Sequence, residues 1–263
     1  MILSSDYHTH TKYSHGKGTI IENAIVAKQK GLKQIAISDH GFSHPAFGLR
    51  EKRLDSYVKD CRFATQQTGV KVLVGIESNV TSIDGDVDLK PKLYDKFDIF
   101  LAGVHKFILY KPNSVFSFSI PNLTLSTLKV DKFPKSLIAR NTKTIINVVK
   151  NNPIDILTHI NFCCPVDVLE VAKVCSDYGT YVELNAKKTH ISEEQLYQMS
   201  KTDVKFVINS DAHTPDRVGE ISLVEKLLSN VKIDEDRIAN INGKIPVFRF
   251  NAFKEGKWTI HKL

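Results

Sequence analysis

The fold is decided by the stretch Ile2-Leu-Ser-Ser-Asp-Tyr-His8-Thr-His10, near the start of the chain. Residues 2–8 of this stretch predict a β-strand, and its two histidines stand at the carboxyl end of that strand. Because side chains alternate along an extended chain, His8 and His10 should lie on one face, and Asp6 should point the same way. Two neighbouring imidazoles can then bind one ion, but an HxH motif also occurs by chance, so a metal site here depends on ligands from the other strand ends.

Short apolar, β-branched runs alternate with longer amphipathic runs along the rest of the chain, which is typical of βα units around a parallel sheet. No linker divides the chain. Seven or eight parallel strands in one domain favour a barrel over an open doubly wound sheet, and no GxGxxG motif follows the first strand. The predicted strands are Ile2–His8, Gln34–Ser38, Lys71–Gly75, Ile99–Val104, Ile154–Thr158, Thr180–Glu183 and Lys205–Asn209, and helical patterns occur near 20–30, 52–68, 135–150, 166–178, 192–200 and 216–229.

Length and composition exclude several classes of protein. The chain has 263 residues, of which 42% are hydrophobic and 25% charged, with 13 Gly and 9 Pro. These values argue against a disordered or fibrous chain and fit one large globular domain or two small ones. No apolar run approaches the roughly 20 residues of a membrane span, and no signal peptide is recognisable, so we expect a cytoplasmic protein without membrane contact. The cysteines, expected to be free and mostly buried, are Cys61, Cys163, Cys164 and Cys175.

Two segments do not fit the repeating pattern. Residues Phe107–Leu128 carry one charge and are too long for an ordinary connection, which indicates a lid or binding loop. The tail Val247–Leu263 predicts either a hairpin packed on the outside or a frayed helix. Net charge is uneven as well, because residues 106–150 hold eight basic residues against one acid, Asp131, and so account for the whole excess of +7. An anionic ligand is plausible there, although a solvated lysine-rich face is the simpler interpretation.

Histidines and acids stand at the carboxyl ends of the predicted strands, which meet at one face of a parallel barrel and form its active site. The set is too rich in imidazole for Ca²⁺ or Mg²⁺ and suits Zn²⁺, Fe²⁺ or Mn²⁺. It exceeds what one ion needs and fits two or three ions that share a carboxylate, and such clusters catalyse hydrolysis. The strand-end residues are His8, His10, His15, His40, Glu77, His105, His159, Glu183, Asn185, Asp211 and His213.

The order of these motifs resembles that of the PHP-domain phosphoesterases, the polymerase and histidinol phosphatase family. The resemblance covers residues 1–230 and leaves 231–263 as a C-terminal extension packed on the barrel. It implies a single-domain α/β fold, a distorted TIM-like (β/α)₇ barrel with a trinuclear metal site. The motifs are Asp6-Tyr-His-Thr-His10, Ile37-Ser-Asp-His-Gly41, Gly75-Ile-Glu-Ser-Asn79, Ala102-Gly-Val-His105, Leu157-Thr-His159 and Ser210-Asp-Ala-His213.

The same resemblance implies how the ligands divide among the ions, with Glu77, Asp211 and His213 at the catalytic centre. Many relatives follow the fifth-strand histidine with Pro and Gly, whereas this chain continues Ile160-Asn-Phe-Cys-Cys-Pro165. This departure leaves the ligand intact but changes the adjoining pocket. The implied ligands are His8, His10, Glu77 and Asp211 for a first ion, Glu77 as bridge with His105 and His159 for a second, and His15, His40 and His213 for a third.

The implied reaction is hydrolysis of a small phosphomonoester by a metal-activated hydroxide, with histidinol phosphate as one candidate substrate. No GxSxG motif suggests a serine nucleophile instead. Lys106 and Arg140 are candidates to bind the ester oxygens. The carboxylates expected to orient ligand imidazoles are those of Asp6, Asp39 and Glu183.

Three histidines stand outside the motifs. His44 is near enough to His40 to face the site, whereas His190 and His261 are expected at the surface.

Two other functions stay open at this point. A nuclease or nucleotide phosphodiesterase would use the same metal site with the +7 segment as a groove for the backbone, and its binding would fall steeply with salt. No nucleic-acid-binding signature supports it. A non-catalytic, metal-stabilised scaffold is less favoured because the ligand set is complete. The native metals and the oligomeric state stay open.

Overall fold

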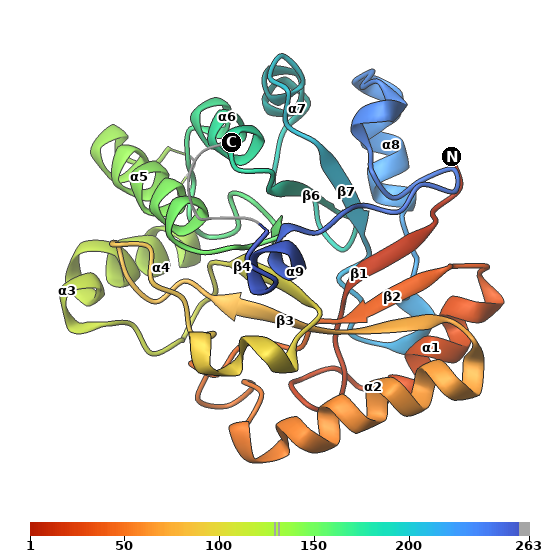
Figure 1. Ribbon diagram of the computed structural model, residues 1–263. Helices are drawn as coiled ribbons and strands as arrows, with labels where there is room; N and C mark the ends of the chain where they lie inside the picture. The colour runs from red at the N-terminus through yellow and green to blue at the C-terminus, as the bar shows by residue number, and fades with distance from the viewer. Residues whose placement is uncertain (129, 131, 258–263) are drawn as a thin grey trace.

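The computed structural model describes residues 1–128, 130 and 132–257 of the chain. Within these ranges, seven parallel strands form one sheet in which each strand pairs with the next along the chain. The sheet curls into a nearly closed barrel with helices outside it (Figure 1), which confirms the predicted fold class. The strands are β1 Ser5–Thr9, β2 Gln34–Ile37, β3 Lys71–Asn79, β4 Ile99–Gly103, β5 Ile156–Leu157, β6 Tyr181–Asn185 and β7 Phe206–Asn209.

Helices connect the strands around the outside. They are α1 Ile20–Gln29, α2 Leu54–Thr68, α3 Pro112–Ser114, α4 Ile120–Thr127, α5 Lys135–Asn151, α6 Val168–Asp177, α7 Glu193–Ser200, α8 Ser222–Asn230 and α9 Arg249–Lys254. Local sequence chemistry determines several of their ends. Ser192 and Gln195 form a capping box at the start of α7, and Gly69 ends α2 with a φ of 76°. None of the helices in the described ranges combines the length and the hydropathy of a transmembrane span.

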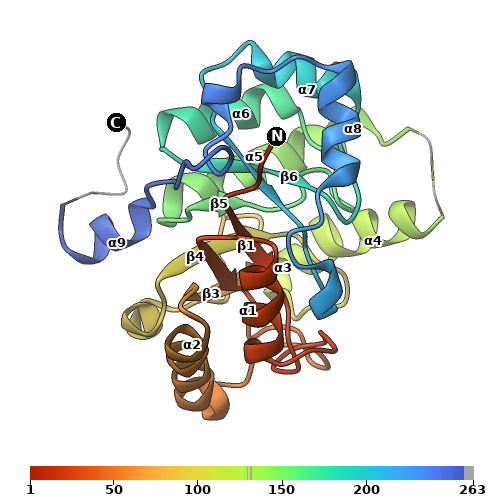
Figure 2. The same cartoon turned by 90° about the vertical axis from the view of Figure 1, so that its right-hand side faces the viewer.

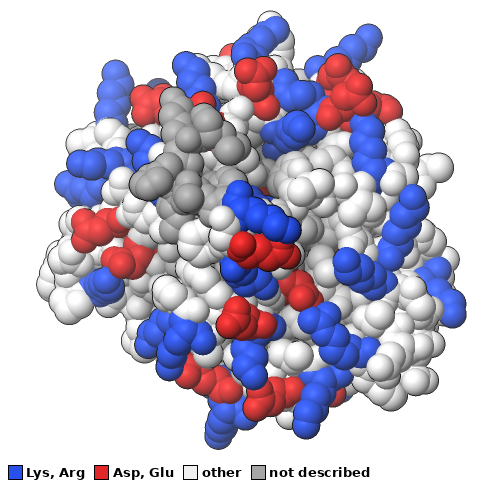
Figure 3. Space-filling view, viewed as in Figure 1, with Lys and Arg blue, Asp and Glu red and all other residues white. Residues whose placement is uncertain are grey.

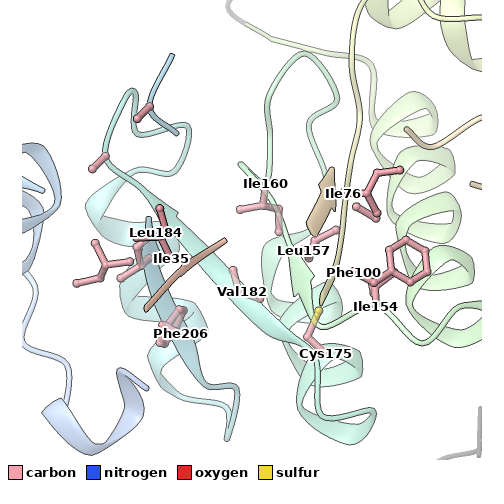
Figure 4. Close-up of a cluster of buried hydrophobic side chains, with 14 of the residues drawn as sticks. Ile35, Ile76, Phe100, Ile154, Leu157, Ile160, Cys175, Val182, Leu184 and Phe206 are labelled. Atoms are coloured by element: carbon pink, nitrogen blue, oxygen red, sulfur yellow. The ribbon is translucent and has the colours of Figure 1, made fainter. Parts of the chain in front are cut away.

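The hydrophobic core has two parts, because alternate residues of a strand face opposite sides of the sheet. The larger part lies between strands and helices, and Figure 4 shows a portion of it around Val182 and Leu157. A smaller cluster inside the barrel includes Leu73 of β3. Further along β3 the same face carries Gly75 and then the buried Glu77, so the interior becomes polar towards the carboxyl ends of the strands.

Side-chain amides close the gap between β1 and β7. The Asn209 side chain accepts a hydrogen bond from the Tyr7 amide at 2.9 Å. The fully buried Asn240 donates to the carbonyls of Ser5 and Ile208, at 2.8 and 2.7 Å, and accepts from the Ile208 amide at 2.9 Å. These bonds replace part of the ladder that two directly paired strands would form.

The residues that follow α8 take part in this closure. Ile238 pairs with Phe206 of β7, and Ile241 pairs with Leu3, just before β1. The expected boundary between a barrel at 1–230 and an appended extension therefore differs from the structure, in which residues 238–241 help to close the barrel. The end of β1 pairs directly with the residues beyond β7, through Thr9 and Ala212, and along other parts of the two edges the later segment supplies the hydrogen bonds.

The segment 107–128 is largely helical, which corrects the expected lid or binding loop. Residues 112–127 form α3, a π-helical turn over Val115–Ser119 and α4. Phe118 is fully buried, and the side-chain amides of Asn122 and Asn141 bond to each other at 2.8 Å, which fixes α4 against α5. Its Pro, Ser and Asn content hides the helix in the sequence, because packing rather than intrinsic propensity stabilises it.

Of the tail, the described residues 247–257 include α9, which lies on the opposite side of the barrel from α4, as Figure 2 shows. Arg249 is buried and donates to the carbonyls of Ile154, Asn152 and Val149, at 2.7, 2.8 and 3.2 Å, and also to that of Tyr178. Of the two predicted forms, the helix is present at 249–254. Residues 258–263, which include His261, lie outside the described part of the chain.

The seam between β1 and β7 can be tested with the substitution Asn240→Ala. This change removes three buried hydrogen bonds and leaves backbone groups of Ser5 and Ile208 without partners, so it should lower the free energy of unfolding by about 2–4 kcal/mol. Urea denaturation measures the effect. Gln66→Ala, at an exposed position in α2, is the control and should change stability by less than about 0.5 kcal/mol. Equal stability of the two variants would contradict the role given to Asn240.

Candidate metal centre

Glu77, near the end of β3, lies at the centre of the rim. Its side chain is fully buried among the rings of four histidines. Its Oε1 lies 2.7 Å from His159 Nε2 and 3.1 Å from His105 Nε2. Its Oε2 lies 2.9 Å from His40 Nδ1 and 3.2 Å from His8 Nε2. Since these histidines come from the ends of β1, β2, β4 and β5, one carboxylate brings four neighbouring connections together.

Asp211 takes a similar position beyond β7. Its Oδ1 lies 3.3 Å from both His10 Nε2 and His213 Nδ1, and 3.8 Å from His8 Nε2. The backbone of Asp211 has a φ of 49°, and that of His159 a φ of 25°. Residues other than glycine rarely adopt positive φ, and such outliers gather at functional sites. Two predicted ligands are therefore held in strained conformations that the surrounding structure must enforce.

Eight of the nine predicted ligands form groups that could each hold one ion. In every group, the donor atoms lie within 4.8 Å of one another. The groups are His8, His10 and Asp211; His8, Glu77 and His159; His40, Glu77 and His105; and His10, His40 and His213.

The ninth predicted ligand, His15, lies beside these groups. Its ring centroid is 4.3 Å from that of His213 and 4.8 Å from that of His40. The resemblance assigned His15 to a third ion with these two residues, whereas in the structure the group that contains both of them is completed by His10. All nine side chains lie at the rim, so the structure differs from the expectation only in which of them group around each candidate ion position.

Many donor atoms of the rim are buried without hydrogen-bond partners, as expected for atoms that bind cations. In the described part of the chain, eight buried atoms without a hydrogen-bond partner belong to six rim side chains. His40 Nδ1 is one of them, because its 2.9 Å contact with Glu77 lacks hydrogen-bond geometry. One unpaired buried polar atom costs about 1–3 kcal/mol, so a gathering of eight fits a site built around positive ions. The atoms are His8 Nε2, both ring nitrogens of His10, His40 Nδ1, Glu77 Oε2, both ring nitrogens of His105, and His159 Nδ1.

The charges of the rim favour the protonation states that bind cations. Burial raises the pKa of Glu77, but the surrounding imidazoles outweigh burial and hold that pKa well below its usual range. Burial lowers the pKa of His105 and of His213 to about 4. At neutral pH the carboxylate is therefore ionised and these imidazoles are neutral. For His8, burial is outweighed by nearby carboxylates, which raise its pKa, so a proton there competes with a cation.

Glu183, on the inner face of β6, positions two of the predicted ligands. Its Oε1 accepts from His8 Nδ1 at 2.7 Å, and its Oε2 accepts from the His159 amide at 2.7 Å. Asn209 and Asn185 each donate to the same carboxylate at 2.9 Å. These bonds leave His8 Nε2 facing Glu77 and fix the ring that would bind an ion.

Asp6 does not point along the direction that strand alternation predicts. It accepts hydrogen bonds from the amides of Gly219, Ser210 and His8, at 2.9, 3.1 and 3.3 Å, and it contacts no imidazole among the described residues. The pairing of β1 with β2 shifts register between Asp6 and Thr9, and such irregularities redirect side chains next to active sites. Asp6 therefore holds the connection that follows β7.

Asp39 shapes a loop in a similar way. Its carboxylate accepts from the amide and hydroxyl of Thr11, at 2.7 and 2.6 Å, and from the hydroxyl of Ser14. These bonds order the turn between His10 and His15. Instead of orienting an imidazole directly, Asp39 orders the backbone that carries two of them.

A cavity of about 290 Å³ opens onto the rim, and three lysines line it: Lys106, Lys187 and Lys188. The Lys187 Nζ lies 3.1 Å from His213 Nδ1. Arg140, a predicted substrate-binding residue, is not among the lining residues. Because α5 places it against the π-helical turn, its guanidinium donates to the Ser117 carbonyl at 2.7 Å. The structure therefore places Lys106 at the cavity and Arg140 away from its lining, against the π-helical turn.

Several residues of the cavity escaped the sequence analysis. Lys187 and Lys188 follow the end of β6 closely, so their strand-end position predicts them at the rim as it does the histidines. Lysine is not a usual metal ligand, and the metal-site pattern therefore did not include them. His190, expected at the surface, also lines the cavity, where its ring centroid is 5.0 Å from that of Phe162. His44 faces the cavity, as expected.

The loop after His159 forms one wall of the cavity. The Phe162 amide donates to the His159 carbonyl at 2.9 Å, and the two ring centroids are 5.2 Å apart. Positive φ values at Asn161 and Cys163, of 71° and 49°, turn the chain so that this ring reaches the cavity. Cys163 is partly buried and Cys164 is buried, and both are free thiols, as expected. The sequence that departs from Pro-Gly therefore places an aromatic side chain beside the metal ligands.

Comparison with known proteins agrees with this geometry. A family model described as the PHP domain matches residues 6–240. The chain belongs to the PHP domain family. It is 32% identical over 257 residues to a probable phosphatase of Thermoanaerobacter sp., covering 93% of this chain and 94% of that protein. It is 28% identical over 283 residues to a probable phosphatase of Vibrio parahaemolyticus, covering 97% and 99% of the two chains.

Two solved structures resemble this PHP-domain protein in fold. The histidinol phosphate phosphatase of Lactococcus lactis, complexed with zinc, L-histidinol and phosphate, has a TM-score of 0.59, 14% identity, and coverage of 94% of this chain and 100% of that one. A putative histidinol phosphatase of Listeria monocytogenes has a TM-score of 0.62, 13% identity, and coverage of 82% and 97%. The expected family is confirmed, and the expected enzyme class agrees with the names of the curated relatives.

Glu183→Gln tests whether this carboxylate positions the ligands of the PHP-domain protein. The change removes the charge that holds His8 and should weaken metal binding by about 10–100-fold while the fold is retained. Competition with a metal-binding dye measures the affinity, and circular dichroism checks the fold. Glu225→Gln, at an exposed position of α8, is the matched control. Wild-type affinity in Glu183→Gln would show that the hydrogen bond to His8 does not matter for binding.

Proposed function

We propose that this PHP-domain protein is a metal-dependent phosphatase that hydrolyses a small phosphomonoester at a centre of two or three divalent ions. The observation that carries the proposal is the gathering of unpaired nitrogen and oxygen donors, among them Glu77 Oε2, beside a cavity. The relatives named probable phosphatases support the reaction class, and the zinc in the Lactococcus lactis structure supports the type of metal. Imidazole-rich sites accept Zn²⁺, Mn²⁺ or Fe²⁺.

The residues of the rim would hold the ions in adjacent positions. The two oxygens of Glu77 face different histidines, Oε1 towards His105 and His159, and Oε2 towards His40 and His8. This carboxylate would therefore bridge two ions. Ions bound in this way supply a nucleophile at neutral pH and neutralise charge on the phosphoryl group. The chain itself then needs neither a serine nor a cysteine nucleophile.

Lys187 would bind the phosphoryl group at the edge of this centre. Its Nζ lies 3.5 Å from Asp211 Oδ1 and 3.1 Å from His213 Nδ1, so its charge is beside the rim while about half of the side chain stays exposed. An ammonium in this place can donate to phosphoryl oxygens and stabilise the charge that develops during transfer.

A nucleic-acid substrate is the second candidate, and the structure offers it less support. Among the described basic residues between 106 and 150, Lys106 is the one that lines the cavity. Lys111 pairs with Asp86 at 2.8 Å, and Arg140 bonds to a backbone carbonyl. Figure 3 shows the opposite end of the barrel, the face that carries α9, where lysine and arginine side chains are interspersed with acidic ones. The +7 segment therefore does not extend the cavity as a backbone groove would.

Removal of the metals should abolish phosphatase activity. After dialysis against a chelator, we expect kcat/KM for a small phosphomonoester to fall more than about 100-fold, because the nucleophile and the charge neutralisation both depend on the ions. Reloading with Zn²⁺, Mn²⁺ or Fe²⁺ should restore activity, and elemental analysis should find two or three ions per chain. Full activity of the stripped protein, or a single ion per active chain, would contradict the proposal.

The substitution Lys187→Gln should mainly weaken binding of the phosphoryl group and stabilisation of its charge in the transition state. Loss of one charge-assisted hydrogen bond predicts a fall of about 10–100-fold in kcat/KM. Steady-state kinetics on one phosphomonoester, with the metal content measured in parallel, tests this prediction. Lys173→Gln, at an exposed position of α6, serves as the control and should match the wild type. Unchanged kinetics with unchanged metal content would remove Lys187 from the site.

A further inference from the structure

The charged residues around the cavity restrict the charge that the leaving group of the substrate can carry. Three lysines line the cavity, whereas Asp211 is the one acidic residue among the lining residues. This carboxylate already contacts His10 at 3.3 Å and Lys187 at 3.5 Å. A positively charged substrate group would therefore find cations around it and no free carboxylate to bind.

The three lysines are not equivalent. Lys187 lies against the rim, where the phosphoryl group would bind. Lys106 and Lys188 also line the cavity, but within residues 1–128, 130 and 132–257 neither forms an ion pair with a protein carboxylate. Lys187 is already placed to bind the phosphoryl group, so the positive charges of Lys106 and Lys188 are available for another part of the ligand. Because no protein carboxylate neutralises them, they favour a ligand with a second negative charge.

The topology places these two lysines on either side of an aromatic wall. Lys106 follows β4 and Lys188 follows β6, while Phe162 follows β5, which pairs with both strands. Phe107, next to Lys106, also lines the cavity with 67% of its surface exposed and a φ of 59°. Aromatic faces can cover a carbon skeleton while flanking ammonium groups bind its charged end.

We propose that the substrate's leaving group carries a second anionic group and that Lys106 and Lys188 bind it. The proposal rests on the phosphatase function proposed above and narrows the substrate class of the same site. Phosphate esters of amino alcohols are disfavoured, because their ammonium group would lie among lysines without a carboxylate partner. A phosphomonoester whose leaving group bears a carboxylate or a further phosphate has the matching charge.

A series of two-carbon esters that differ in charge tests this inference. The metal-loaded, full-length protein is assayed with 2-phosphoglycolate, ethyl phosphate and phosphoethanolamine, whose leaving groups are anionic, neutral and cationic. We expect kcat/KM to be about tenfold higher for the anionic ester than for the neutral one, and lowest for the cationic ester. Binding of 3-phosphonopropionate, propylphosphonate and 3-aminopropylphosphonate, which cannot be hydrolysed, should follow the same order by calorimetry.

The metal ions also attract carboxylates and could by themselves cause a preference for the anionic ester. Substitution of the lysines distinguishes their contribution to this preference from that of the ions. Lys106→Gln and Lys188→Gln should each narrow the ratio between the anionic and the neutral ester, and the double variant should bring it close to one. Lys143→Gln removes an exposed lysine of α5 that does not line this cavity and should leave the ratio as in the wild type.

Each outcome decides a different point. A preference for the anionic ester that disappears in the double variant supports the inference. Hydrolysis of all three esters without that preference, or with a preference that survives the double variant, overturns the inference and leaves the phosphatase function standing. Hydrolysis of none of them overturns the proposed function, and the phosphonate series then still determines whether the two lysines select a second anionic group.

Discussion

One buried carboxylate organises the active end of this barrel. Glu77 has no exposed surface, yet its two oxygens lie within 3.2 Å of nitrogens from four histidines. An isolated ionised carboxylate would be costly in such a place, and only positive charge around it makes the arrangement stable. The imidazoles hold its pKa low, but their own unpaired nitrogens need a further partner. Divalent ions would meet both requirements, which is the physical basis for the metal centre proposed here.

The rest of the structure supports this concentration of polar groups. The barrel interior is apolar only around Leu73 and its neighbours, and polar side chains occupy it towards the carboxyl ends of the strands. Asn240 satisfies strand edges that are not directly paired, and Glu183 holds two of the predicted ligands in place. Strained backbone at Asp211 persists because this network fixes it from several sides. Stability of the scaffold therefore comes from the hydrophobic layer outside the strands, while the rim carries the strain.

Much of this arrangement could be predicted because it depends on local patterns. Strand-length apolar runs gave the order of β1 to β7, and the parallel barrel follows from that order, since it brings the histidines to one face. The helix at 112–127 could not be found in the same way, because Phe118 and the Asn122–Asn141 pair stabilise it through contacts with α5. The direction of Asp6 was missed for a similar reason, since a register shift with β2 overrides strict alternation.

The sequence by itself determined the family, the barrel and the set of candidate metal-binding side chains, because residue type and strand position are written in the chain. Tertiary structure decided which of these side chains share an ion, and it moved Arg140 out of the cavity and brought Lys187 and Lys188 into it. The physical reason is that spacing along the chain fixes which strand end carries a residue, whereas the direction of a long side chain depends on the loops and helices packed around it.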